Sequence, residues 1–421
     1  MVSAETNPAR RRGGHRLRTA ILLLLVGCGA IAAYRVFNPW GDEAMAASAE
    51  RARTPIPSSY FGMTVNAIGL PRPWPTLDFN AVRLWGAIYW AQVNPAPGSY
   101  NWTRFDRIVQ EAEQRRLDVV FNLAYTPRWA AASRDALPAF SPGASSPPAD
   151  LGVWEDWVRS AVTRAAGRIR YWEIWNEPED PKYYSGDVET MVRLQQRAYE
   201  IIKSIDPTLI VLTPSSNGTA EGYRWQAAFL EKGGGRYADV FAFHGYVSDP
   251  EAVLPVIQRF KGMLAAQGLQ GKPIWDTEAG WPLKDANQAA YLARSYLLKW
   301  AMGVDRSYWY EVDGGGSDFG RLWEPSSGLL ASGVAFQTVR HWLEGARVQG
   351  LSRLGRSLWR LDLVLSDGHK AQVVWSAAGN AAYQVSGRYW LRHDLDGGTH
   401  AIVDGRLEVG PRPVMLTEEQ N

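Results

Sequence analysis

Short apolar runs alternate with longer amphipathic stretches from residue 60 onward. The apolar runs are rich in β-branched and aromatic residues, which favours strands. Eight such runs are found, at residues 60–65, 81–85, 118–123, 169–175, 209–213, 239–244, 273–278 and 305–310. This alternation predicts repeated β/α units around a parallel sheet.

The stretches between the runs have helical spacing. The clearest one stops at Asp206-Pro207, because proline disfavours helix at the residue before it. Its apolar stripe consists of Met191, Leu194, Ala198, Ile201 and Ile205. The other predicted helices are 102–116, 151–166, 223–231, 252–267, 287–302 and 334–344.

The number of units favours a closed barrel. Eight units in about 290 residues suit an α/β fold of the (β/α)8 TIM-barrel type, whose usual size is about 250 residues before insertions. The alternative is a doubly wound open sheet. That fold usually carries a glycine-rich phosphate turn after its first strand, and residues 62–66 offer none.

The pattern changes near Arg347 to short alternating segments separated by Gly, Asp and Asn. These segments, at 359–365, 371–376, 382–385 and 406–409, predict a small C-terminal all-β, sandwich-like domain over 347–421. We expect it to support the barrel at 58–346, and carbohydrate binding is the alternative.

The amino terminus combines a basic segment with an apolar one. Residues 9–18 are basic, and residues 19–37 are apolar apart from Arg35. At about 1.5 Å per residue, the apolar segment reaches about 28 Å, close to the thickness of a bilayer core. The positive flank predicts a cytoplasmic tail at 1–18 and a transmembrane signal anchor at 19–37.

Two other processing routes stay open. Leu25-Val26-Gly27-Cys28 resembles a bacterial lipobox, and the small residues around Ala44-Met45-Ala46 suit ordinary signal cleavage. Every route predicts a bacterial protein whose barrel is periplasmic or extracellular, and the anchored form is the one expected. Residues 38–57 are then a linker.

Composition excludes several function classes. Forty-five Lys and Arg against 43 Asp and Glu leave a net charge of +2, too small to predict nucleic acid as a partner. The single cysteine, Cys28, and the scattered histidines predict no zinc site, and we expect no cofactor. No serine-hydrolase elbow or Walker loop occurs. Twenty Trp and 18 Tyr provide rings that pack in cores or stack on sugars.

Two predicted strands end in carboxylates. Glu177 follows the fourth strand, and Glu278 ends the seventh. Barrel active sites lie where strands end, so both side chains are expected at one mouth. Paired carboxylates suit glycoside hydrolysis, in which one group protonates the departing oxygen and the other acts at the anomeric carbon.

The motifs around these residues resemble a known clan. Trp175-Asn176-Glu177-Pro178, with Glu278 ending the seventh strand, is similar to the retaining (β/α)8 glycoside hydrolases. Other segments resemble glycoside hydrolase family 39 and its exopolysaccharide-associated bacterial relatives. These segments are 61–65, 82–85, 97–102 and 126–130, together with the C-terminal β domain. The resemblance spans about residues 58–416.

The resemblance implies a role for each matching residue. Glu177 is the expected acid/base and Glu278 the nucleophile, so the pKa of Glu177 should be raised while Glu278 stays ionised. Asn176 would hold the sugar 2-hydroxyl. Arg83 would keep Glu278 charged, although a structural ion pair with Glu173 is the alternative.

Further residues are expected around the two glutamates. His244 and Tyr246 match a His-x-Tyr arrangement that would orient both carboxylates, and a packed core histidine is the alternative. Trp309 is expected as the platform under the reacting sugar, or else as a core residue. Further candidates, for flanking subsites, are Tyr89, Asn122, Trp129 and Trp281. Asp276 is expected to form a supporting ion pair.

The sequence therefore predicts an exported, membrane-anchored retaining glycosidase that binds and cleaves a polysaccharide, and a bacterial exopolysaccharide is the expected substrate. Alternatives are a clan relative with β-glucanase or β-xylosidase specificity and a non-catalytic barrel that binds polysaccharide.

Overall fold

The computed structural model describes residues 45–46, 53–136, 140–282, 286–314 and 320–418. The predicted cytoplasmic tail, the anchor at 19–37 with Cys28, and most of the linker lie outside these residues. Within the described part of the chain, no helix is both long and apolar enough to cross a membrane. The anchor therefore stays a prediction.

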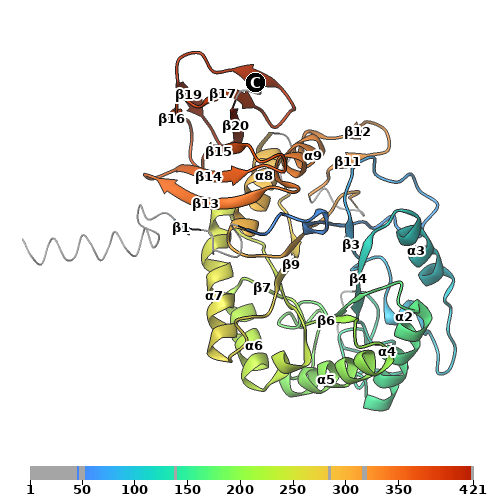
Figure 1. Ribbon diagram of the computed structural model, residues 1–421. Helices are drawn as coiled ribbons and strands as arrows, with labels where there is room; N and C mark the ends of the chain where they lie inside the picture. Colours follow the sequence, from blue (N-terminus) through green and yellow to red (C-terminus); the bar gives the residue numbers. More distant parts are fainter. Residues whose placement is uncertain (1–44, 47–52, 137–139, 283–285, 315–319, 419–421) are drawn as a thin grey trace, which may run out of the picture.

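A parallel sheet of nine strands forms the centre of the larger part of the chain (Figure 1). Its strand order is β6-β5-β4-β3-β2-β10-β9-β8-β7. The strands are β2 (Phe61–Thr64), β3 (Ala81–Arg83), β4 (Asp118–Leu123), β5 (Tyr171–Ile174), β6 (Ile210–Leu212), β7 (Ser216–Asn217), β8 (Phe241–His244), β9 (Ile274–Ala279) and β10 (Arg306–Trp309). Each of the eight predicted runs overlaps one strand, of which β9 extends one residue past its run, and β7 follows the fifth run.

The two ends of this sheet meet. A parallel bridge joins Leu212 of β6 to Val240, just before β8, and the Thr213 N–H donates to the Val240 carbonyl at 3.0 Å. Strands β6 and β7 thus act as one interrupted strand between β5 and β8. The sheet curls into a TIM-barrel-like arrangement, as the sequence predicts, rather than an open doubly wound sheet.

Helices follow the strands and cover the outside of the curled sheet (Figure 1). They are α3 (Thr103–Gln114), α4 (Leu151–Ala165), α5 (Val188–Ile205), α6 (Ala220–Glu231), α7 (Val253–Ala266), α8 (Ala286–Ala301) and α9 (Ala331–Leu343). Short helices α2 (Trp90–Val93), η2 (Ser58–Tyr60), η3 (Gly234–Tyr237) and η4 (Pro250–Ala252) were not predicted. They are too short to carry a helical period.

Local signals explain where α5 begins and ends. The Asp187 side chain accepts a hydrogen bond from the Thr190 N–H at the start, and Asp206 before Pro207 ends the helix. Met191, Leu194, Ala198 and Ile201 of the predicted stripe are buried. Ile205 was placed on the same stripe, and this was wrong: it is 39% exposed, because the helix ends there.

The carboxy-terminal segment forms antiparallel sheets. The larger has the order β1-β13-β14-β15-β20-β17-β18, and β16 pairs with β19. These strands are β1 (Met45–Ala46), β13 (Arg347–Leu354), β14 (Leu358–Val364), β15 (Lys370–Ser376), β16 (Ala381–Gln384), β17 (Tyr389–His393), β18 (Thr399–Ala401), β19 (Arg406–Val409) and β20 (Val414–Glu418). Strands β11 (Trp323–Glu324) and β12 (Gly328–Leu329) form a separate ribbon before α9.

The predicted all-β character of this segment is confirmed, with one surprise. Met45–Ala46, placed in the linker, pairs with Gly350 and Leu351 of β13 as an edge strand. The large sheet lies beside α8 and α9 (Figure 1). The indole N–H of Trp375 donates to Glu251 of η4 at 2.7 Å, which ties the sheet to the barrel.

Candidate active site

Arg83, the last residue of β3, connects the polar groups at the mouth of the barrel. Its guanidinium donates to Glu173 at 2.7 Å, to Glu278 at 2.6 Å and to the side-chain oxygen of Asn176 at 2.6 Å. Arg83 is fully buried, and so is Glu173. Both contacts predicted for Arg83 therefore occur: it pairs with Glu173, and it also donates to Glu278.

Glu177 is positioned by an unusual backbone. Trp175 and Glu177 have positive φ angles of 66° and 43°, a left-handed conformation that residues other than glycine rarely adopt. The Glu177 N–H donates to the Ser215 carbonyl at 2.8 Å, and its own carbonyl accepts from the Asp180 N–H. Such strain persists where surrounding contacts hold it, often at functional sites.

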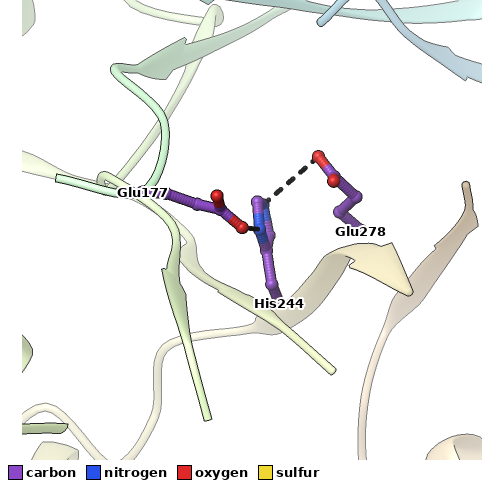
Figure 2. A group of neighbouring side chains, drawn as sticks. All are labelled: Glu177, His244 and Glu278. Atoms are coloured by element: carbon purple, nitrogen blue, oxygen red, sulfur yellow. Dashed lines mark hydrogen bonds and ion pairs between the residues drawn. The ribbon is translucent and has the colours of Figure 1, made fainter. Parts of the chain in front are cut away.

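His244, the last residue of β8, lies between the two carboxylates (Figure 2). Its Nδ1 is 2.8 Å from Glu177 Oε1, and its Nε2 is 3.8 Å from Glu278 Oε2. The Tyr246 hydroxyl donates to Glu278 Oε1 at 2.7 Å. The structure thus brings together His244 and Tyr246 with both glutamates, as the sequence predicts.

Asn176 has one free donor in the site. Its side-chain oxygen accepts from Arg83, while its buried Nδ2 has no hydrogen-bond partner among the described residues. A buried donor without a partner is costly unless a ligand fills the role. This geometry leaves the Asn176 N–H groups available for a hydroxyl of a bound molecule.

Asn217 of β7 was not predicted as a site residue. Its side chain donates to Glu177 Oε1 at 2.8 Å, and its backbone N–H donates to Glu179 at 2.7 Å. It therefore holds two carboxyls near each other. The only sequence signal was the polar run 213–217 at the end of the fifth strand, where barrel sites are expected.

The pKa order of the two glutamates is the reverse of the one expected from the sequence. Burial favours a raised pKa for Glu177, but the hydrogen bond and charge of His244 outweigh it and lower that pKa. Burial raises the pKa of Glu278, and the charge of Glu177 adds to this against His244 and Arg83. Burial would lower the pKa of His244, but the charges of Glu278 and Glu177 raise it. His244 therefore favours the ionised form of Glu177.

The remaining predicted residues lie at different depths. Asn122 is buried. Its side chain donates to Glu173 at 3.1 Å and to the Trp175 carbonyl at 2.7 Å, so it helps to hold the residues that position the site. Trp309 is 1% exposed and packs 5.8 Å from Trp281, so both rings face mainly protein. Trp129 is half-buried and donates to the Asn94 carbonyl.

Tyr89 is half-buried and lies among other rings near the mouth. Asp276 forms the expected supporting ion pair, with buried Lys299 at 2.7 Å.

Glu177, His244 and Glu278 also carry the ligand types that bind metal ions. Among the described residues, Glu177, His244 and Glu278 are the one group whose ligand atoms all lie within 4.8 Å of one another. Arg83 is 2.6 Å from Glu278, and its fixed positive charge opposes a cation there. The arrangement is better suited to moving protons between carboxyls and a bound oxygen than to holding a metal.

A barrel-like sheet with one buried and one half-buried carboxylate at its strand ends, Glu278 and Glu177, is typical of a glycosidase. The chain belongs to the glycosyl hydrolase catalytic core family, whose model matches residues 99–311. It is a glycoside hydrolase, as the sequence predicts. No curated protein matched the chain.

Solved structures share the fold at low sequence identity. A family 39 glycoside hydrolase from Bacteroides cellulosilyticus WH2 is 19% identical, with a TM-score of 0.69 over 88% of this chain and 82% of that one. A β-xylosidase from Caulobacter crescentus CB15 is 17% identical, with a TM-score of 0.63 over 89% and 99%. A glucosidase from Croceicoccus marinus is 16% identical, with a TM-score of 0.61 over 88% and 98%. The coverage extends the likeness to the C-terminal sheets.

Proposed function

We propose that this protein is a retaining glycosidase that cleaves a polysaccharide outside the cytoplasm, with a bacterial exopolysaccharide as its substrate. The observation that carries the mechanism is the spacing of the two glutamates. One carboxylate oxygen of Glu177 lies within 4.8 Å of one of Glu278. Retaining enzymes hold their carboxyls about 5–5.5 Å apart, whereas inverting enzymes need about 6.5–9.5 Å to admit a water.

The contacts favour Glu278 as nucleophile and Glu177 as acid/base. Glu278 receives a hydrogen bond from Arg83 at Oε2 and one from Tyr246 at Oε1, which hold both oxygens in place and favour the charged form. In the first step, Glu278 attacks the anomeric carbon as the bond to the leaving oxygen breaks. That oxygen takes a proton from Glu177. A water, deprotonated by Glu177, then attacks the anomeric carbon and releases Glu278.

The pKa order requires one further step before cleavage. Because the contact with His244 favours the ionised form of Glu177, cleavage requires that this contact weaken when the substrate binds. A leaving-group oxygen beside Glu177 and the loss of water both favour the protonated carboxyl. His244 lies 2.8 Å from Glu177, and the charges of both glutamates raise its pKa, so we infer that it supplies that proton.

The location and the substrate rest on other grounds. The basic flank and apolar segment at 9–37 favour export with a membrane anchor. A specificity for β-xylosides or β-glucans is the second candidate, supported by a β-xylosidase and a bifunctional glucanase-xylanase among the structures of similar fold. Release of reducing ends from bacterial exopolysaccharides, xylan and β-glucan separates these candidates.

Azide rescue tests the division of roles. The assay uses an activated aryl glycoside that the parent enzyme cleaves. Glu177→Ala should keep the first step on this substrate, and azide should yield a glycosyl azide of unchanged anomeric configuration. Glu278→Ala should lose activity by several orders of magnitude, and any azide product should have the opposite configuration.

The control is Glu221→Gln, on the exposed face of α6, which should behave like the parent. Inversion by the parent enzyme, or parental activity in either alanine variant, would falsify the assignment.

A further inference from the structure

A groove on the outer surface of the barrel is formed by α4 and by the residues that precede α3, two of the helices that cover the sheet (Figure 1). We call it the flank groove. Its volume is about 770 Å³, within the range of about 300–1,000 Å³ that is usual for ligand sites. Its lining includes Tyr100 and Trp102 before α3, Arg159, Ser160 and Arg164 of α4, and Arg168 after α4.

Stacked rings form the aromatic side of the flank groove. Tyr100 and Trp102 are half-buried, their ring centroids are 5.2 Å apart, and their planes differ by 2°. The Trp102 ring stacks on the buried Trp157 at 6.1 Å, and Trp157 stacks on the buried Trp90 at 5.8 Å. The Ser160 hydroxyl donates to the Tyr100 hydroxyl at 3.3 Å. Rings held in this way lose little freedom when a ligand binds, which favours affinity.

The barrel wall separates the flank groove from the catalytic glutamates. Behind the groove, the Trp157 ring lies 6.4 Å from that of Phe121, a buried residue of β4. Neighbouring side chains on a strand point to opposite faces of a sheet. Asn122, the next residue of β4, points to the inner face and donates to Glu173 of the catalytic site. The flank groove is therefore a site of its own on the outside of the sheet.

The other side of the flank groove is basic. Arg164 donates through Nε to Asp106 at 2.9 Å, and Nη1 of Arg168 lies 3.7 Å from Glu113. These two pairs orient the guanidinium groups and neutralise part of their charge. Arg159 is exposed and forms no ion pair with a residue that the structure describes. A planar guanidinium binds a carboxylate through paired N–H groups, so Arg159 offers the groove a donor for an anion.

We propose that the flank groove is a second, non-catalytic binding site for an anionic polysaccharide, in which a sugar that carries a carboxylate stacks on Tyr100 and pairs with Arg159. The C–H face of a pyranose packs on an aromatic ring, and its carboxylate accepts from a guanidinium. A neutral sugar would gain the stacking alone. This inference rests on the proposed function, because a polysaccharide bound on the flank is kept near the catalytic glutamates.

Calorimetric titration of the full-length protein in a Glu278→Gln background tests the site. The probes are β-1,4-tetraglucuronate and cellotetraose, which differ only in the carboxylates at C6. Arg159→Glu replaces an attraction by a repulsion, so it should weaken tetraglucuronate binding by about 10-fold and leave cellotetraose binding unchanged. Arg159 is exposed, so this variant should fold like the background. Variants of the groove leave the catalytic residues intact, so any binding there is the same in all of them.

A pair of variants at Tyr100 tests the stacking. Tyr100→Ala removes the ring and should weaken tetraglucuronate binding by about 3- to 10-fold. Tyr100→Phe keeps the ring and should bind like the background. Equal binding by Tyr100→Ala and the background would remove the stacking contact and overturn the site as proposed.

The matched control for the charge is Arg236→Glu, at an exposed arginine of η3. It changes the net charge as Arg159→Glu does, and it should leave tetraglucuronate binding unchanged. The site is overturned if the background binds no tetraglucuronate or if Arg159→Glu binds it as the background does. It is also overturned if Arg236→Glu weakens binding as much as Arg159→Glu, or if Arg159→Glu weakens cellotetraose equally.

Hydrolysis assays of the parent enzyme separate this inference from the proposed function. Cleavage of a polysaccharide, with tetraglucuronate binding that does not depend on Arg159, removes the flank site and keeps the function. Binding that depends on Arg159, in a parent that cleaves no glycoside, keeps the flank site and removes the function.

Discussion

Replacing Arg83 with methionine should destabilise the protein in a pH-dependent way. The side chain is fully buried and donates to Glu173, Glu278 and Asn176 at 2.6–2.7 Å. Removing one partner of a buried ion pair costs about 3–5 kcal/mol. Arg83→Met removes the cation that two carboxyls share, so we expect the free energy of unfolding to fall by about 3–5 kcal/mol at neutral pH. A folded domain has about 5–15 kcal/mol of stability in all.

The sign of the pH dependence follows from Glu278. Its pKa is already raised by burial, and losing Arg83 must raise it further. Below its unfolded-state pKa, Glu278 is protonated in both the folded and the unfolded variant. The raised pKa then costs the variant little stability. As the pH rises, the unfolded state releases this proton before the folded variant does, so the deficit grows until the folded pKa is passed.

Urea denaturation, followed by tryptophan fluorescence at pH 4.5 and pH 7.5, measures this effect. The deficit of Arg83→Met relative to the parent should be larger at pH 7.5. Arg83→Lys keeps the charge and should lose less. The acid limb of the kcat/KM profile should also move to higher pH in Arg83→Met, because the nucleophile ionises later. Parental stability at pH 7.5, or an equal deficit at both pH values, would refute the reasoning.

Two further predictions concern Glu179 and the location of the protein. Burial raises the pKa of Glu179 to about 6, and its carboxyl shares Asn217 with Glu177. Glu179→Gln removes a negative charge beside the Glu177–His244 pair, so the proton that this pair holds should be lost more readily and the alkaline limb of kcat/KM should move to lower pH. An unchanged limb contradicts this coupling. Alkaline phosphatase fused after Asn421 should be active in bacterial cells, and Cys28→Ser should leave the protein in the membrane fraction. An inactive fusion contradicts export, and release of the Cys28→Ser protein indicates the lipoprotein route instead.

The sequence by itself determined the main elements of the barrel and the positions of the two glutamates. The apolar run 118–123 coincides with β4, and the stripe from Met191 to Ile201 lies on the buried face of α5. These elements were predictable because period and caps are properties of neighbouring residues. Glu177 and Glu278 were recognisable because each ends an apolar run, where a barrel places its site.

Only the tertiary structure decided how these residues act on one another. Arg83 reaches Glu278 across 195 positions of sequence, and Asn217 reaches Glu177 across 40. No local pattern encodes such contacts. The pKa order of the glutamates was predicted wrongly because it depends on the 2.8 Å contact of His244 with Glu177 and on burial. The rings of Trp85, Tyr89, Phe140, Tyr183 and Tyr310 contact one another although they come from separate connections, and no local pattern predicts such contacts. Charge and packing act through space, so their outcome is settled only when the barrel has formed.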